Sequence, residues 1–174
     1  MSMKVTIFGA SSCSEEEYNN AVSLGSKLAA EGYTIVNGGY CGTMEATAKG
    51  AKENGGNAIG IIVPTVLIHR DPEGNQYLTS NIKEKTLNDR INKLIEIGDA
   101  YIILPGSLGT LNEFLYVMTT IYISSDSNTQ KKPVIAFSKP WKDIWNTSAK
   151  ELNIPESVSK NIIFVDTVRS LIFS

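Results

Sequence analysis

The chain has 174 residues, of which 42% are hydrophobic and 20% are charged, which predicts one globular domain over residues 1–174. Its 16 Lys and Arg residues nearly balance its 18 Asp and Glu residues, and no long run of one sign occurs, so we expect no nucleic-acid partner. No stretch approaches the roughly 20 consecutive apolar residues of a membrane span, and the first residues show no signal-peptide pattern. We therefore expect a cytoplasmic protein with neither a membrane nor a nucleic-acid partner.

The content of metal-binding residues is low. The chain contains 2 Cys and 1 His, which is too few Cys for a disulfide framework in a chain of this length. Cys13 and Cys41 also lack the spacing of metal ligands. We therefore predict no metal site and no cofactor.

Short apolar runs rich in β-branched residues alternate with longer segments of helical periodicity. The apolar runs predict strands at residues 5–8, 33–36, 58–63, 100–104, 133–137 and 162–165. The periodic segments predict helices at residues 14–31, 43–54, 83–97, 141–152 and 167–173, and one more that opens from the turn at 105–110 and runs to about residue 124. This alternation is typical of βαβ units, so we expect an α/β protein with a Rossmann-like, three-layer αβα architecture and a mostly parallel central sheet.

Local signals mark some of these boundaries. Ser14 and Glu17 have the spacing of a capping box, and Gly32 stands where a helix C-terminal cap belongs. Residues 65–81, which contain His69, are polar and irregular. A connection of this kind is either a binding flap or a solvent loop.

Three turns rich in small residues follow predicted strands and lead into helices, at residues 9–12, 38–42 and 105–110. In a parallel sheet they share the edge at the carboxyl ends of the strands, where ligands bind. Glycine lets backbone N–H groups approach an anion, and the amino end of the following helix adds partial positive charge. A single glycine turn is explained by chain reversal alone, but three at one edge favour a phosphorylated ligand. Neither a GxxxxGK[ST] loop nor a GxGxxG fingerprint is present.

The third turn is followed by an acidic residue. Thr110, at the expected helix start, and Glu113, three residues later, have the spacing of an ordinary capping box. Alternatively, Glu113 in the first helical turn directs a carboxylate into the crevice, where it accepts hydrogen bonds from sugar hydroxyls or stabilises positive charge. Arg90, near the start of the preceding helix, is the complementary cation, although an arginine beside Asp89 is also typical of a solvated helix surface.

At these residues the chain resembles the Lonely Guy (LOG) family and its relatives, the molybdenum cofactor carrier proteins. The family motif PGGxGTxxE is present at residues 105–113 as PGSLGTLNE. The resemblance covers nearly the whole chain and includes Gly9-Ala10-Ser11-Ser12, Gly38-Gly39 and the run from Gly55-Gly56 to Pro64.

The resemblance implies an enzyme that cleaves the N-glycosidic bond of a purine or cytokinin-type nucleoside 5′-monophosphate, releasing the free base and ribose 5-phosphate. Arg90 and Glu113 match the two residues that the family uses for catalysis. The resemblance places the AMP-like ligand's phosphate on the motif turn, with further pocket residues from the first two turns. The residues so implied are Ser12, Gly39, Gly106, Ser107, Gly109 and Thr110.

The resemblance also implies a homodimer with the pocket near the interface. The helix after the motif is apolar and would supply part of the contact through Phe114, Leu115, Val117, Met118 and Ile121. The alternative is that this face packs on the sheet.

Three departures from the family pattern support a second hypothesis. Ser107 replaces the second glycine of the motif, and Ile91 replaces the lysine that follows the catalytic arginine in the family. Residues 42–46, GTMEA, resemble the GxMEA segment of the molybdenum cofactor carriers, in which Glu45 is the acidic residue. The second hypothesis is a non-catalytic protein that binds or carries a nucleotide or the molybdenum cofactor.

Overall fold

A computed structural model describes residues 2–124 and 132–171. The described residues form a seven-stranded sheet in the order β4-β3-β2-β1-β5-β6-β7, and every neighbouring pair is parallel. The strands are β1 (Lys4–Phe8), β2 (Thr34–Asn37), β3 (Asn57–Ile62), β4 (Ser80–Lys83), β5 (Ala100–Ile103), β6 (Val134–Phe137) and β7 (Ile162–Val165). The helices are α1 (Glu15–Ala30), α2 (Thr43–Glu53), α3 (Leu87–Ile97), α4 (Leu108–Ile123), α5 (Ser138–Glu151), α6 (Glu156–Ser159) and the 3-10 helix η2 (Val168–Ser170).

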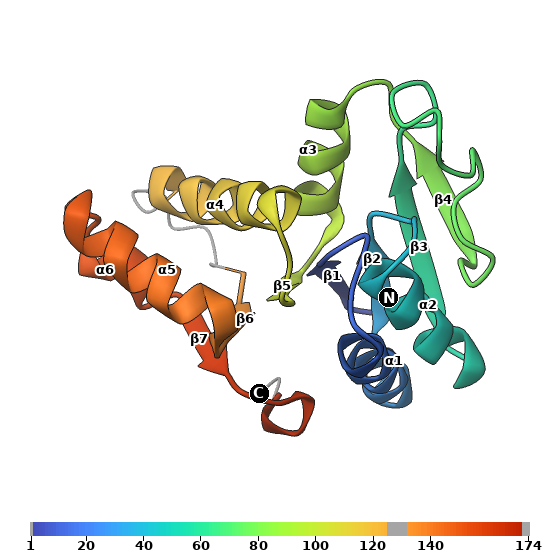
Figure 1. Ribbon diagram of the computed structural model, residues 1–174, viewed down its shortest axis with the longest axis horizontal. Coiled ribbons are helices and arrows are strands. Elements are labelled where there is room, and N and C mark those ends of the chain that lie inside the picture. The colour runs from blue at the N-terminus through green and yellow to red at the C-terminus, as the bar shows by residue number, and fades with distance from the viewer. Residues whose placement is uncertain (1, 125–131, 172–174) are drawn as a thin grey trace.

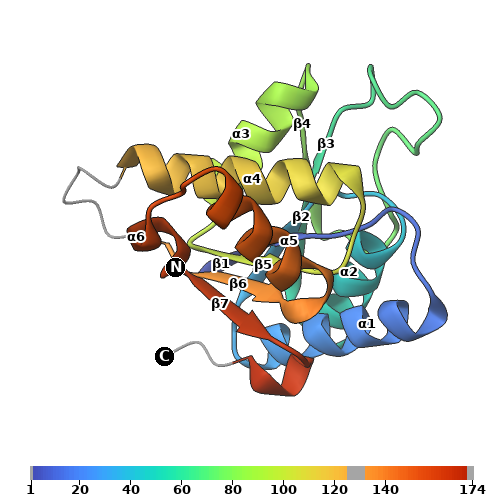
Figure 2. The same ribbon diagram turned by 60° about the vertical axis from the view of Figure 1, so that its left-hand side comes forward.

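Helices cover both faces of the sheet. In Figure 1 and Figure 2, α1 and α2 lie on one side and α3 and α4 on the other. Alternate strand residues feed two separate cores, since Val5 and Ile35 pack in the core beneath α1, whereas Phe8 and Val36 pack in the core that also holds residues of α3, α4 and α5. The expected Rossmann-like αβα architecture is therefore confirmed.

The segment between β3 and α3 differs from expectation. A helix was expected over residues 83–97, but Ser80–Lys83 pairs with β3 as an edge strand and the helix begins at Leu87. Thr86 caps the helix, because its side chain accepts a hydrogen bond from the Asp89 amide. The edge strand was missed because its residues are exposed or half-buried and form no apolar run.

The carboxyl-terminal third also differs in detail. Helix α5 begins at Ser138 instead of residue 141, with a non-helical Lys139 inside it, and the short helix α6 was not expected. The helix expected over 167–173 is reduced to η2, and residues 172 and 173 of that prediction lie outside the described residues. Trp141 and Trp145 are buried against Phe114, so both tryptophans serve packing.

The three glycine-containing turns lie at one edge of the sheet. They follow β2, β1 and β5, which are neighbours in the sheet, and the parallel order brings their carboxyl ends together. The strand order reverses between β1 and β5, which is where parallel α/β sheets bind ligands. The capping box of α1 is also confirmed, since the Ser14 side chain accepts from the Glu17 amide and the Glu17 carboxylate accepts from the Ser14 amide.

Candidate functional site

The motif turn places the amino end of α4 at the switch point. Helix α4 begins at Leu108 with Ser107 as its N-cap, so Thr110 is not the helix start and does not form a capping box with Glu113. Glu113 lies in the second helical turn, not the first. The expectation failed because the turn is shorter than its glycines suggested: the chain enters helical geometry directly after Ser107.

The amino end of α4 is open to an anion. The first amides of a helix have no intrahelical acceptor, and in the described part of the chain no side chain caps these amides and no acidic residue lies in the first turn. Helix α1 differs, because Ser14 and Glu17 cap it and its first turn carries Glu15, Glu16 and Glu17. Helix α2 has Glu45 in its first turn. Of the three turns, the one at the amino end of α4 is electrostatically best suited to phosphate.

Thr110 supports the same assignment. The residue is 2% exposed, and within the ranges that the structure describes its hydroxyl makes no hydrogen bond. The neighbouring turn leaves room for this side chain only because position 106 is glycine, since a Cβ on Gly106 would collide with the Thr110 hydroxyl. This hydroxyl, beside helix amides that no side chain caps, is a hydrogen-bond donor available to a ligand.

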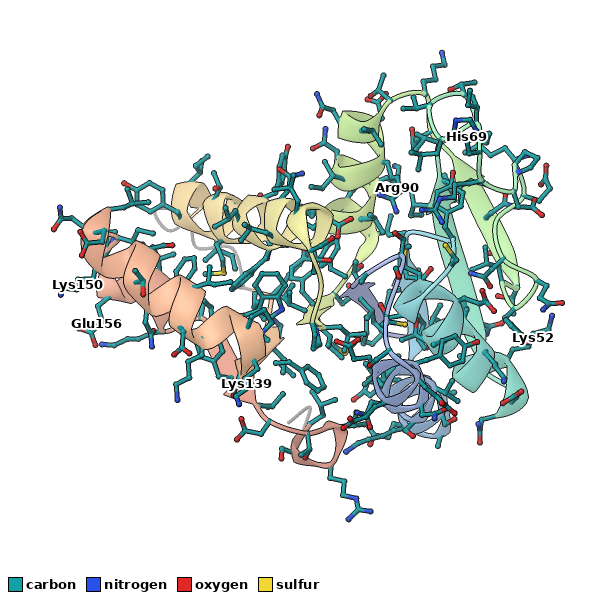
Figure 3. All side chains as sticks on the ribbon, viewed as in Figure 1. Lys52, His69, Arg90, Lys139, Lys150 and Glu156 are labelled. Atoms are coloured by element: carbon teal, nitrogen blue, oxygen red, sulfur yellow. The ribbon has the colours of Figure 1, made fainter. Side chains whose placement is uncertain are left out.

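Arg90 and Glu113, predicted as the catalytic pair, come together. Arg90 Nη1 lies 3.5 Å from Glu113 Oε1, and the two side chains are only 13% and 14% exposed. Arg90 extends from α3 and Glu113 from α4, so residues of two helices meet above the sheet edge. Figure 3 shows Arg90 on the side of α3 that faces the loops of β2 and β3. The interpretation of Arg90 as a solvated surface residue is wrong.

Backbone carbonyls hold the arginine in place. Arg90 Nε donates to the carbonyl oxygen of Ile61 at 2.8 Å, and Nη2 donates to that of Gly38 at 3.2 Å. A side chain at position 38 would overlap Arg90 Nη2, so the second turn needs glycine there for the arginine to fit. Sequence reasoning identified Arg90 but not these anchors, because carbonyl acceptors leave no sequence signal.

Burial and the charge of the partner shift the pKa values of Glu113 and Arg90 in opposite directions. Desolvation raises the pKa of Glu113 to about 7, although the Arg90 charge lowers it. Desolvation lowers the pKa of Arg90, against the effect of Glu113. A carboxyl group that titrates near neutral pH beside a fixed cation is suited to proton transfer and to stabilising positive charge.

The other predicted pocket residues are distributed along the same edge. Ser12 is exposed in the turn after β1. Gly39 is buried with a φ of 76°, and its amide donates to Asn37 Oδ1 at 2.8 Å. Its amide therefore already has a partner, so any contribution of Gly39 to a ligand pocket would come from the space it leaves. The ligand contacts of both residues stay predictions.

The expected flap is tied to the second turn. Asn75 donates from its amide to Gly39 O at 2.8 Å and from its side chain to Tyr40 O at 2.9 Å. His69 is exposed on this segment, away from Arg90 in Figure 3. Residues of the segment form one wall of a polar pocket of about 440 Å³ that also includes Glu45. Tyr18 donates to Glu45 at 3.3 Å, and burial together with the Glu45 charge raises the pKa of Tyr18 to about 12.

A larger cavity adjoins the motif turn on the side of α1. It measures about 710 Å³, and Leu104, Pro105 and the end of β6 form part of its wall. Arg90 and Glu113 are not among its lining residues. The carboxyl edge of the sheet therefore has one cavity beside the motif turn and a separate polar pocket beside the turn after β2.

The all-parallel sheet, with its switch point between β1 and β5, defines an α/β protein of the Rossmann-like class. The chain belongs to the SLOG cluster4 family, whose sequence model matches residues 2–172. This match confirms the resemblance to the LOG family that the motif residues indicated.

Named relatives agree with this assignment. A cytokinin riboside 5′-monophosphate phosphoribohydrolase of Mycobacterium tuberculosis is 31% identical over 125 residues, which cover 70% of this chain and 62% of that protein. The cytokinin riboside 5′-monophosphate phosphoribohydrolase LOG of Oryza sativa subsp. japonica is 29% identical over 161 residues, 87% of this chain and 63% of that protein. The chain thus spans less than two thirds of the length of both relatives.

The fold has a close counterpart among solved structures. The molybdenum cofactor binding protein from Rippkaea orientalis aligns with a TM-score of 0.75 at 22% identity, covering 97% of this chain and 92% of that one. This similarity establishes the common fold. The structure contains no helix, among its described residues, that is long and apolar enough to cross a membrane.

Proposed function

We propose that the protein is a phosphoribohydrolase that cleaves the N-glycosidic bond of a purine or cytokinin-type nucleoside 5′-monophosphate. The observation that carries the proposal is the buried pair of Arg90 and Glu113 on the helix pair beside the open amino end of α4. The names of the relatives from Mycobacterium tuberculosis and rice support it.

The 5′-phosphate would bind at the amino end of α4. The free amides of Leu108, Gly109 and Thr110 point out of the helix end, and the helix dipole favours an anion there. The hydroxyls of Ser107 and Thr110 would add donors. Ser107 thus replaces the glycine of the family motif with a residue that has its own hydrogen-bonding group.

Glu113 and Arg90 would act on the bond between C1′ and the base. As this bond breaks, positive charge develops on the sugar, and a carboxylate next to C1′ stabilises it. The ionised Glu113 also accepts a proton from the attacking water, whose oxygen joins C1′. The proton that Glu113 takes from the water passes on to the departing base, so one water molecule supplies both the oxygen on C1′ and the hydrogen on the base. The Arg90 charge lowers the pKa of Glu113 and so favours the ionised carboxylate.

The second candidate function is binding of a nucleotide or of the molybdenum cofactor without turnover. The 710 Å³ cavity favours it, because its volume lies in the upper part of the roughly 300–1,000 Å³ range of ligand pockets and its wall excludes the catalytic pair. Glu45, in the segment that resembles the carriers, lies at the polar pocket instead.

Incubation with AMP and with an N6-substituted AMP, followed by chromatography of free base and ribose 5-phosphate, tests the proposal. We expect the wild type to release both products and Glu113→Gln to lose at least about 100-fold in turnover while keeping nucleotide affinity. Glu156→Gln is the matched control, since Glu156 is exposed on α6 and forms an ion pair with Lys160.

If the protein binds nucleotide saturably but releases no product, the carrier function replaces the phosphoribohydrolase function as the assignment. Equal turnover by wild type and Glu113→Gln would remove Glu113 from the mechanism. Titration with the isolated molybdenum cofactor, compared with AMP, then distinguishes the two ligands of the second candidate.

We also propose a homodimer that uses the outer side of α4. The inner side does not contribute, because Phe114, Val117, Met118 and Ile121 are buried within the chain, so the expectation that they form the contact is wrong. The outer side carries large exposed apolar residues at seven-residue spacings, namely Leu108, Leu115, Tyr116, Tyr122 and Ile123. A groove of about 240 Å³ between α4 and the segment around Ile154 continues this surface.

A further inference from the structure

Tyr40, in the turn after β2, lies beneath the arginine of the candidate catalytic pair. Arg90 Cζ lies over the Tyr40 ring, 5.9 Å from its centre. The ring is 4% exposed and the arginine side chain 13% exposed, so little water screens the attraction between the cation and the ring. Sequence analysis gave no role to Tyr40.

The Tyr40 ring is itself fixed. The Val63 amide donates to the Tyr40 hydroxyl at 2.9 Å, and the Asn75 side chain donates to the Tyr40 carbonyl at 2.9 Å. Apolar contacts with Met44, Ile62 and Leu67 surround the ring. Hydrogen bonds at both ends of the residue and packing between them leave the ring one orientation.

Two of the three guanidinium nitrogens of Arg90 donate to backbone carbonyls, which leaves Nη1 to face the Glu113 carboxylate. Nε and Nη2 donate to the carbonyls of Ile61 and Gly38, which are bonds in the plane of the guanidinium. Nη1 faces Glu113 at 3.5 Å. The two carbonyl bonds fix the direction of the guanidinium within its plane, and the face of Tyr40 restrains its tilt out of that plane.

We propose that Tyr40 is a positioning residue whose ring holds the Arg90 guanidinium so that Nη1 faces the Glu113 carboxylate. Tyr40 acts through Arg90 and not by contact with the reacting atoms. The consequence for turnover rests on the proposed function, whereas the orientation of Arg90 is a property of the protein alone and is measured without substrate.

Two substitutions separate the ring from the hydroxyl. Tyr40→Leu removes the ring, and Tyr40→Phe keeps the ring but removes the acceptor of the Val63 amide. Both variants leave the Val63 amide without its partner, so a difference between them reports the ring. Leu67→Ala is the control for lost packing, because Leu67 lies in the same apolar cluster and does not contact Arg90 through any polar group.

The first readout is hydrogen exchange of the Arg90 Nε–H, observed by NMR in the protein without ligand. We expect about tenfold faster exchange in Tyr40→Leu, and values close to wild type in Tyr40→Phe and Leu67→Ala. The second readout is turnover of AMP. We expect kcat to fall about tenfold in Tyr40→Leu with KM changed by less than about twofold, and Tyr40→Phe to restore kcat.

An unchanged exchange rate of the Arg90 Nε–H in Tyr40→Leu would overturn the inference. An equal rise in exchange and an equal fall in kcat in Tyr40→Phe would also overturn it, since the hydroxyl would then be the responsible group. Equal effects in Leu67→Ala would reduce Tyr40 to a packing residue. If the wild type releases no base from AMP, the proposed function fails, and the exchange of Arg90 still decides the role of Tyr40.

Discussion

Glu113 is a carboxyl group whose environment makes ionisation difficult at acidic pH. Its pKa is raised to about 7 by burial, and the nearby Arg90 charge offsets part of this effect. An ordinary glutamate would be ionised throughout the neutral range. The activity and the stability of the protein should therefore both depend on pH in the range where this one group titrates.

The proposed mechanism needs the ionised Glu113, so activity should rise with pH through about 7. We expect kcat/KM on AMP to fall about tenfold for each pH unit below that point and to level off above it. A pH–rate profile from pH 5 to 9 measures this. A flat profile over that range would show that protonation of Glu113 does not limit the reaction.

Stability should change in the opposite direction. Between its usual pKa of 4.5 and about 7, Glu113 holds a proton in the folded state but not in the unfolded state, so the free energy of unfolding falls as pH rises through this window. The loss across the whole window is roughly 3 kcal/mol. Denaturant unfolding of wild type and Glu113→Gln at pH 5 and pH 8 tests it: the pH dependence should be smaller in the variant.

Removing the arginine should raise the pKa of Glu113 further. Arg90 lowers the pKa of Glu113, so Arg90→Met should raise that pKa above about 7 and shift the acid side of the pH–rate profile upward. Carbon NMR of the labelled Glu113 carboxyl group measures the pKa directly. Lys93→Met, which removes a half-buried cation paired with Glu96 one turn along α3, should leave the pKa of Glu113 unchanged.

At the residue scale, the sequence was sufficient to name Arg90 and Glu113 but not to explain their placement. Their residue types and the motif spacing indicated the pair. The acceptors that fix Arg90 are carbonyls of Ile61 and Gly38, and any residue carries a carbonyl. Only the glycine at position 38 left a trace in the sequence, because a side chain there would occupy the place of the guanidinium.

Among the elements, the amino end of α4 combines two glycines with different tasks. A Cβ on Gly106 would collide with Thr110, whereas a Cβ on Gly109 would meet nothing within 4 Å. Gly106 therefore serves close packing in the turn, and Gly109 lies in open space on the first helical turn. Gly109 is the position that a phosphate would approach under the proposed function.

The two glycines should respond differently to alanine. Gly106→Ala should lower the free energy of unfolding by about 1–3 kcal/mol and weaken AMP binding, because Thr110 must move. Gly109→Ala should raise the free energy of unfolding by up to about 1 kcal/mol, since alanine favours the helix. Denaturant unfolding compares the two. Equal destabilisation would contradict the assignment of separate tasks.

Elements with an apolar face were predictable, and elements without one were not. The apolar runs at β1, β2, β3, β5, β6 and β7 indicated every interior strand, and periodicity indicated α1 to α5. The edge strand β4 is polar and gains its structure by pairing with β3, so only tertiary contact reveals it. The start of α4 was misplaced because glycine and serine in the motif suggested a longer turn than residues 104–107, which connect β5 to the helix.

For the whole molecule, the apolar outer side of α4 is the basis for expecting a dimer. Leu115 and Tyr122 are 42% and 53% exposed on that side. We expect the wild type to have twice the monomer mass by light scattering, and Leu115→Asp or Tyr122→Asp to be monomeric. Ile163→Asp is the control, since Ile163 is a 54% exposed apolar residue on the edge strand β7 and not on α4. A monomeric wild type would refute the dimer proposal.

The position of β1 in the middle of the sheet sets the order in which the chain can fold as it is synthesised. β1 pairs with β2 on one side and with β5 on the other, and the Lys4 amide donates to the Asp99 carboxylate, 95 residues along the chain. At typical rates of translation those residues take on the order of 5–20 s to emerge. During this interval one edge of β1 stays unpaired while β1 to β4 can already assemble.

Arg90 meets Glu113 only after β5 has closed that edge and α4 has followed it out of the ribosome. We therefore expect nascent chains stalled before β5 to hold a folded β1–β4 half with an unpaired, aggregation-prone edge on β1, and to depend on chaperones until β5 is synthesised.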